Sequence, residues 1–265
     1  MSRVEDLEIL PGVTGRWYWP TETPQGVLVY FHGGGFALGS LDSHDGLVRS
    51  IARQSDALVV SVAYALAPEH PFPVAVDQAV EVVSYLNQEH RRGALGVPGG
   101  LAVGGDSAGG TLATVAALDL GIHAPGALDA LVLMYPLVDA SMDYASVEEN
   151  AIGYFLTKDE LEWFGQLYLG GDEPIDDPRI SPLRADHLEV LPRTFVLVAG
   201  FDPLRDQGIA FADALVRAGV ETQLRQYPTM IHGFCSLERV STVAAGAVSD
   251  LAIYLREVLS RESER

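Results

Sequence analysis

The chain has 265 residues, 48% of them hydrophobic and 20% charged, which supports a full apolar core and excludes a disordered protein. Its formal net charge of −19 argues against nucleic acid or an anionic membrane as a partner, because phosphate groups would be repelled. No apolar run reaches the length of a membrane span, no signal peptide is evident, and the single cysteine, Cys235, excludes an internal disulfide. These features predict a cytoplasmic protein.

Two short strands are predicted near the N-terminus, over 4–10 and 15–19, with a turn at Pro11-Gly12 between them. Continuous apolar runs follow, each of the length expected for a strand that is covered on both faces. These runs lie at 27–31, 57–62, 101–103, 130–135 and 194–199. An alternating stretch at 221–227 predicts one further strand.

Helical periodicity separates the strands. It predicts helices over 41–54, 74–88, 111–120, 207–218 and 241–259. We expect Asp42 or Ser43 to cap the first of these helices, and Gly219 to end the fourth. Because strands alternate with helices, the sequence predicts a mainly parallel sheet in a single α/β domain over 1–265.

Residues 141–193 interrupt this alternation, because the segment is too long for a simple crossover. It contains one clear predicted helix, which begins with a capping box at 157–160 and continues with apolar residues at helical spacing. We expect the segment to form a cap over the carboxyl edge of the sheet, where α/β proteins bind ligands. The alternative is a long surface insertion without function.

The pentapeptide Gly105-Asp106-Ser107-Ala108-Gly109 fits the pattern G-x-S-x-G between a predicted strand and a predicted helix. A serine on such a strained turn presents its hydroxyl above the sheet, and the flanking glycines let neighbouring backbone approach. The pattern predicts that Ser107 is a catalytic nucleophile. Taken alone, the pentapeptide is also a common accident of glycine-rich turns.

A serine nucleophile needs a base and an acid that orients the base. Asp202 and His232 each follow a late predicted strand, and the order Ser107, Asp202, His232 is that of the α/β-hydrolase triad. Asp206 is the alternative acid, with a structural role as its other interpretation. The other six histidines do not follow a late strand in the required order.

The stretch His32-Gly33-Gly34-Gly35 follows a buried strand and predicts an oxyanion hole. We expect backbone N–H groups of Gly33, Gly34 and Gly35, with that of Ala108, to bind the oxyanion; the sequence leaves open which two of the glycines donate. His32 is expected to shape the loop by hydrogen bonding.

These blocks resemble the hormone-sensitive-lipase-like esterases, the bacterial family IV carboxylesterases of the α/β-hydrolase superfamily. The matching blocks are HGGGFALGS at 32–40, YALAPEHPFP at 64–73, GDSAGG at 105–110, DPLRD at 202–206 and HGF at 232–234. The resemblance implies an α/β-hydrolase fold and a carboxylic ester hydrolase without metal or organic cofactor. It also implies a small-molecule ester with a short acyl chain as substrate, and frequent homodimerisation through the last strand.

The sequence departs from the family at two places. Ala65 stands where the family usually has arginine, which removes an ion pair from the scaffold. Residues 1–26 are predicted as strands where family members usually carry cap helices, so the cap is reduced to 141–193. We therefore expect an open acyl site that accepts bulkier or more varied esters. Phe36, Asp106, Trp163 and Phe164 are the predicted substrate-binding residues.

Two other functions stay open. An arylformamidase or another amidase on the same fold would use the same triad and an HGG loop, although the blocks at 64–73 and 105–110 favour an esterase. A non-catalytic binding protein of the hydrolase fold would have lost the histidine that is present here as His232.

Overall fold

The computed structural model of the protein describes residues 1–171 and 174–260. Its sheet has eight strands in the order β1-β2-β4-β3-β5-β6-β7-β8. β1 pairs with β2 and β2 with β4 in antiparallel fashion, and the pairs from β4 through β3 to β8 are parallel. The mostly parallel α/β architecture is therefore confirmed. The strands are β1 (Arg3–Leu10), β2 (Val13–Trp19), β3 (Val27–Phe31), β4 (Leu58–Ala63), β5 (Leu101–Asp106), β6 (Ala130–Met134), β7 (Thr194–Phe201) and β8 (Thr222–Ile231).

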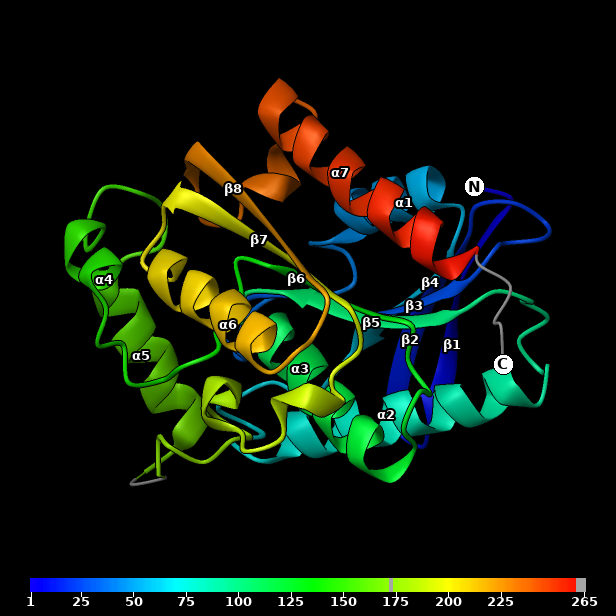
Figure 1. Cartoon of the computed structure of the whole chain (residues 1–265), viewed down its shortest axis with the longest axis horizontal. Helices are drawn as coiled ribbons and strands as arrows, with labels where there is room; N and C mark the ends of the chain where they lie inside the picture. The colour runs from blue at the N-terminus through cyan, green and yellow to red at the C-terminus, as the bar shows by residue number, and fades with distance from the viewer. Residues whose placement is uncertain (172–173, 261–265) are drawn as a thin grey trace.

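Helices cover both faces of the sheet (Figure 1). α1 and α7 lie on one face, and α2, α3 and α6 lie on the other, so that the core forms two apolar layers. All residues of β3 and β6 are buried, as expected for central parallel strands whose two faces are both covered. The helices are α1 (Asp45–Ser55), α2 (Val74–Arg91), α3 (Ala108–His123), α4 (Ala145–Glu149), α5 (Lys158–Leu169), α6 (Arg205–Arg217) and α7 (Thr242–Leu259).

The first helix begins later than the sequence predicts. Neither Asp42 nor Ser43 caps it: α1 begins at Asp45, and the preceding residue, His44, makes no side-chain cap hydrogen bond. Ser43 instead closes a turn with Ser40, in which each side-chain oxygen accepts a hydrogen bond from the other residue's backbone N–H. The prediction of the cap was wrong because this turn uses the side chain that would otherwise cap the helix.

The strand that precedes the nucleophile is longer than predicted. β5 runs to Asp106 because Gly104 and Gly105 stay extended and pair with β3 and β6. At Gly105 an added Cβ would lie 2.4 Å from the carbonyl oxygen of Gly109, so the strand reaches Ser107 only with glycine at this position.

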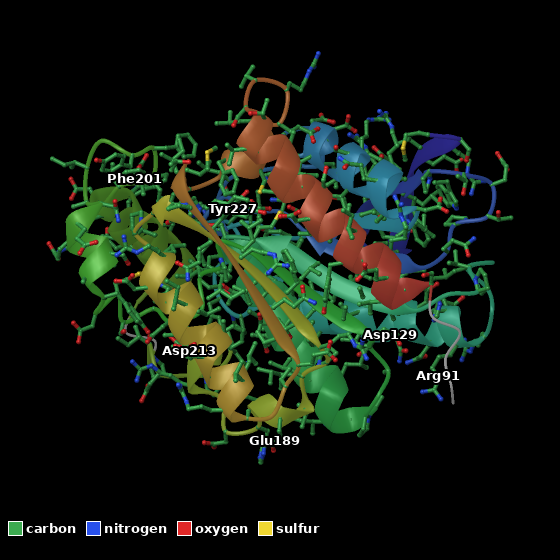
Figure 2. The ribbon with its side chains drawn as sticks, turned by 45° about the horizontal axis from the view of Figure 1, so that its top comes forward. Arg91, Asp129, Glu189, Phe201, Asp213 and Tyr227 are labelled. Carbon is green, nitrogen blue, oxygen red and sulfur yellow. The ribbon has the colours of Figure 1, made fainter. Side chains whose placement is uncertain are left out.

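Residues 141–193 contain α4, α5 and two 3₁₀ turns, Pro182–Arg184 and Leu188–Val190. The predicted capping box is confirmed, since the side chains and backbone N–H groups of Thr157 and Glu160 bond reciprocally at the start of α5. α4 and α5 lie beyond the carboxyl end of β7 (Figure 1). Phe201 lies at this end of β7 (Figure 2) and stacks on Tyr154, with ring centroids 4.8 Å apart. Residues 172–173 of the predicted cap lie outside the described residues.

Gly109 is expected to be essential for the fold. A Cβ at this position would lie 2.0 Å from the carbonyl oxygen of Phe31, and backbone cannot move aside cheaply. We predict that Gly109→Ala lowers the free energy of unfolding by more than about 3 kcal/mol, measured by urea denaturation. The matched control is Gly246→Ala in α7, where an added Cβ meets no atom within 4 Å and should stabilise by about 0.5–1 kcal/mol. Equal stability of the two variants would contradict this account of the turn.

Candidate active site

Ser107 lies on a sharp turn between β5 and α3. Its φ of 54° and ψ of −123° place a non-glycine residue in a strained region of the backbone map. The turn is held by hydrogen bonds from the Ser107 N–H to the carbonyl of Met134 (2.9 Å) and from the Leu137 N–H to the carbonyl of Ser107 (3.2 Å). These contacts with the end of β6 fix a conformation in which the serine side chain projects from the sheet edge.

His232 and Asp202 meet Ser107 at this edge. His232 Nε2 lies 2.9 Å from the Ser107 Oγ, and His232 Nδ1 lies 2.8 Å from the Asp202 Oδ2. Asp202 follows β7 and is fully buried, and its other carboxylate oxygen accepts a hydrogen bond from the Leu204 N–H (2.8 Å). The three predicted side chains therefore stand in hydrogen-bond order, although 125 positions separate the serine from the histidine.

Asp206, the alternative acid, lies outside this chain of hydrogen bonds. One carboxylate oxygen accepts a hydrogen bond from the Ser146 N–H (2.8 Å) at the start of α4, and the other accepts from the Arg205 Nε (2.8 Å). Asp206 therefore connects the cap segment to α6, which agrees with its structural interpretation.

The glycine loop after β3 faces the serine, but Gly33 is not free to bind an oxyanion. Its N–H donates to the Asp106 Oδ1 (2.8 Å), so the prediction that Gly33 is a donor was wrong. The N–H groups of Gly34 and Gly35 have no acceptor among the described residues. With the N–H of Ala108, at the start of α3, they remain the candidate donors.

Asp106 was predicted to bind substrate, and the structure corrects this. Although it borders the cavity, its buried carboxylate is occupied: Oδ1 accepts from the Tyr30 hydroxyl (2.6 Å) as well as from the Gly33 N–H. Burial alone would raise the pKa of Asp106, but nearby His44 and these hydrogen bonds hold it below the usual range. Asp106 therefore anchors the glycine loop as an anion.

His32 contributes to the shape of the same loop. Its Nδ1 lies 2.8 Å from the Gly33 carbonyl oxygen, and its own carbonyl accepts a hydrogen bond from the Tyr64 hydroxyl (2.8 Å). Burial lowers the pKa of His32 to about 4, so the imidazole is neutral near pH 7. These contacts agree with a structural role for this histidine.

A cavity of about 810 Å³ opens beside Ser107. Among the predicted substrate-binding residues, Phe36 and Phe164 line it, whereas Trp163 does not. Trp163 is 47% exposed on α5 and packs at a tilt on Phe164, because the neighbouring position on the helix, Phe164, faces the glycine loop instead. The prediction for Trp163 was therefore wrong.

Helix α5 touches the glycine loop directly. The Phe164 ring lies so close to Gly35 that an added Cβ on the glycine would be 2.2 Å from a ring carbon. One turn further along α5, Tyr168 stacks on Phe36 with ring centroids 3.8 Å apart. Tyr168 also lines the cavity, and sequence reasoning missed this role, although its spacing of four residues from Phe164 could have indicated it.

The chain matches known proteins over most of its length. The family model described as alpha/beta hydrolase fold matches residues 28–236. The chain is 42% identical to the carboxylic ester hydrolase LipN of Mycobacterium tuberculosis, over 97% of this chain and 71% of that protein. It is 34% identical to an acetyl esterase of Salmonella choleraesuis, over 90% of this chain and 74% of that protein.

Solved structures agree with these relatives. The esterase of Pyrobaculum calidifontis superposes with a TM-score of 0.92 at 37% identity, covering 97% of this chain and 85% of that one. The chain therefore belongs to the α/β-hydrolase family, and the resemblance to its hormone-sensitive-lipase-like carboxylesterases is confirmed.

Proposed function

We propose that the protein is a serine carboxylic ester hydrolase that acts on short- to medium-chain acyl esters through an acyl-enzyme. The observation that carries this proposal is the continuous hydrogen-bonded series of Ser107, His232 and Asp202, of which the serine and the histidine line the cavity. The esterase names of the relatives support it, and they do not favour the amidase alternative.

In this mechanism the Ser107 Oγ attacks the acyl carbon while His232 Nε2 takes the hydroxyl proton. Asp202 accepts the hydrogen bond of the His232 Nδ1–H and stabilises the imidazolium that forms. The N–H groups of Gly34, Gly35 and Ala108 bind the developing oxyanion. His232 then gives the proton to the departing alcohol, and water, activated by the same imidazole, releases the acid.

Residues 141–193 are proposed to act as the cap of this site. Phe164 and Tyr168 of α5 line the cavity, and residues 1–26 form β1 and β2 at the far edge of the sheet. Within the described residues, the helices proposed to cover the site therefore come from this one segment. A site covered by one segment and not by two supports an open acyl site. The acetyl esterase relative supports small acyl groups as the preferred ones.

A panel of esters tests this proposal. We expect turnover of nitrophenyl acetate and butyrate, tolerance of bulky alcohols because the cavity is large, and little turnover of formylkynurenine. Ser107→Ala protein serves as the blank for spontaneous hydrolysis. Restriction to the smallest acetates would contradict the open site, and faster turnover of formylkynurenine would establish the amidase instead.

The assembly and the cellular location are separate proposals. β8 is an edge strand that pairs with β7, and we propose that two copies form a homodimer through its free edge, which light scattering would test. Tyr227 of β8 lies beside α7 (Figure 2), and its hydroxyl donates to Asp250 of that helix (2.7 Å).

No helix in the described part of the chain is long and apolar enough to cross a membrane, and a cytoplasmic location stays a prediction.

A further inference from the structure

The buried carboxylate of Asp106 has one histidine as its cationic partner. His44 Nε2 lies 3.5 Å from the Asp106 Oδ2, and the side chain of His44 is 12% exposed. No lysine or arginine forms an ion pair with Asp106 among the described residues. A buried carboxylate with a titratable partner depends on pH in a range where a carboxylate beside arginine would not.

The contacts of Asp106 lead directly to the oxyanion loop. Its Oδ2 faces His44, while its Oδ1 accepts the hydrogen bonds of the Gly33 N–H and the Tyr30 hydroxyl. The next residue after Gly33 is Gly34, a candidate oxyanion donor. We propose that His44 is a positioning residue, which holds the oxyanion loop in its active shape through the carboxylate of Asp106. This proposal rests on the proposed esterase function.

Of the titratable groups around Asp106, His44 is the one that carries the positive charge. His32 stacks on it with ring centroids 5.3 Å apart, and burial keeps the pKa of His32 low, at about 4. Tyr30 donates to Asp106 and Tyr64 stacks on His32, and burial raises the pKa of both hydroxyls well above the usual value. Burial by itself would lower the pKa of His44, but the charge of Asp106 raises it above the usual value.

The direction of the pH dependence follows from this. A group whose pKa is raised in the folded protein contributes its stabilisation below its usual pKa and loses it as the pH rises through the raised value. Above that pH, Asp106 is a buried anion without a cation, a costly state that favours loop conformations open to water. The turnover number should therefore fall on the alkaline side, as the pH rises through the raised pKa of His44.

Removing the charge at either partner tests the proposal. In the wild type we expect kcat for nitrophenyl acetate to fall about tenfold on the alkaline limb, less than the hundredfold or more that a lost oxyanion donor costs. His44→Gln should show a kcat about tenfold below that of the wild type, without the alkaline limb. KM should stay within about threefold, because Phe164 and Tyr168, which also line the cavity, lie on α5 and make no contact with His44 that would be lost. The double variant His44→Gln, Asp106→Asn should recover kcat, since it removes the unpaired charge.

The matched control is His123→Gln, whose pH profile should equal that of the wild type because His123 lies at the exposed end of α3, where it pairs with Asp119. A wild-type alkaline limb that persists in His44→Gln would overturn the proposal, as would a double variant no faster than the single one. If the His44–Asp106 pair were only structural, His44→Gln would lower the free energy of unfolding but leave the pH profile of kcat unchanged. That result would also overturn the proposal.

A titration by NMR separates this proposal from the esterase function. The imidazole signal that is absent from His44→Gln is the signal of His44. In the wild type it should titrate with a pKa above the usual histidine value, and in Asp106→Asn with a pKa lower than in the wild type. An unshifted titration would overturn the pairing whether or not the protein hydrolyses esters. Absence of ester turnover together with a shifted titration would overturn the proposed function and, with it, the role of the pair in catalysis.

Discussion

Ser107→Ala is expected to reduce kcat for nitrophenyl acetate by about 10⁴-fold or more, to the level of the spontaneous reaction. The reason is that the reaction loses its nucleophile while the cavity and the candidate oxyanion donors stay in place. The variant should fold normally, because the Ser107 Oγ contacts His232 alone among the hydrogen-bond partners described, and alanine has the same Cβ at the strained turn. Initial rates and thermal unfolding measure the two properties.

The control for this variant is Ser249→Ala on α7. The Ser249 hydroxyl donates to Gln54 (2.7 Å) on the opposite side of the sheet from α6, so its loss should leave kcat within a factor of about two. A fluorophosphonate probe should label the wild type and Ser249→Ala, but not Ser107→Ala. If Ser107→Ala kept more than about 1% of the wild-type rate, the assignment of the nucleophile would be wrong.

Asp202→Asn is expected to reduce kcat by about 10⁴-fold. The carboxylate that now accepts the hydrogen bond of His232 Nδ1 would become an amide, which favours the wrong tautomer of the imidazole and cannot stabilise its cation. Because Asp202 is fully buried and also accepts the Leu204 N–H, the shape of the turn should survive an isosteric change.

Asp206→Asn provides the comparison for this second prediction. It removes a carboxylate only four positions away that pairs with Arg205 and caps the start of α4. We expect kcat within about fivefold of the wild type and a loss of about 1 kcal/mol in the free energy of unfolding, since the ion pair is partly exposed. A larger loss of activity in Asp206→Asn than in Asp202→Asn would show that Asp206, and not Asp202, is the acid that orients His232.

The sequence predicts those parts of the fold that depend on local pattern. The buried runs became the central strands, and the strand, turn and helix around Ser107 lie where G-x-S-x-G places them. The early strands and the capping box at Thr157 also follow from short-range chemistry. Boundaries were less accurate, since β5 and α3 both extend beyond their apolar runs through glycines that only the packed sheet makes necessary.

The errors at the site come from contacts that the chain order does not contain. Asp106 and Gly33 are 73 positions apart, so a hydrogen bond that occupies the glycine N–H leaves no mark in the local sequence. Trp163 and Tyr168 are both aromatic residues of one helix, and periodicity alone does not say which side of α5 turns toward the cavity. In both cases the residue type is compatible with a binding role and with a structural role, and tertiary packing decides between them.

The aromatic contacts between α5 and the glycine loop limit how freely the cap can be exchanged. Phe164 lies against Gly35, and Tyr168 stacks on Phe36, so the cap helix serves as one wall of the loop that faces the nucleophile. A cap transplanted from another hydrolase would need an aromatic ring at each of these two places. If α5 acts as a cap, we expect a chimera that replaces it to alter the glycine loop as well as the cavity, and so to change catalytic rate together with substrate range.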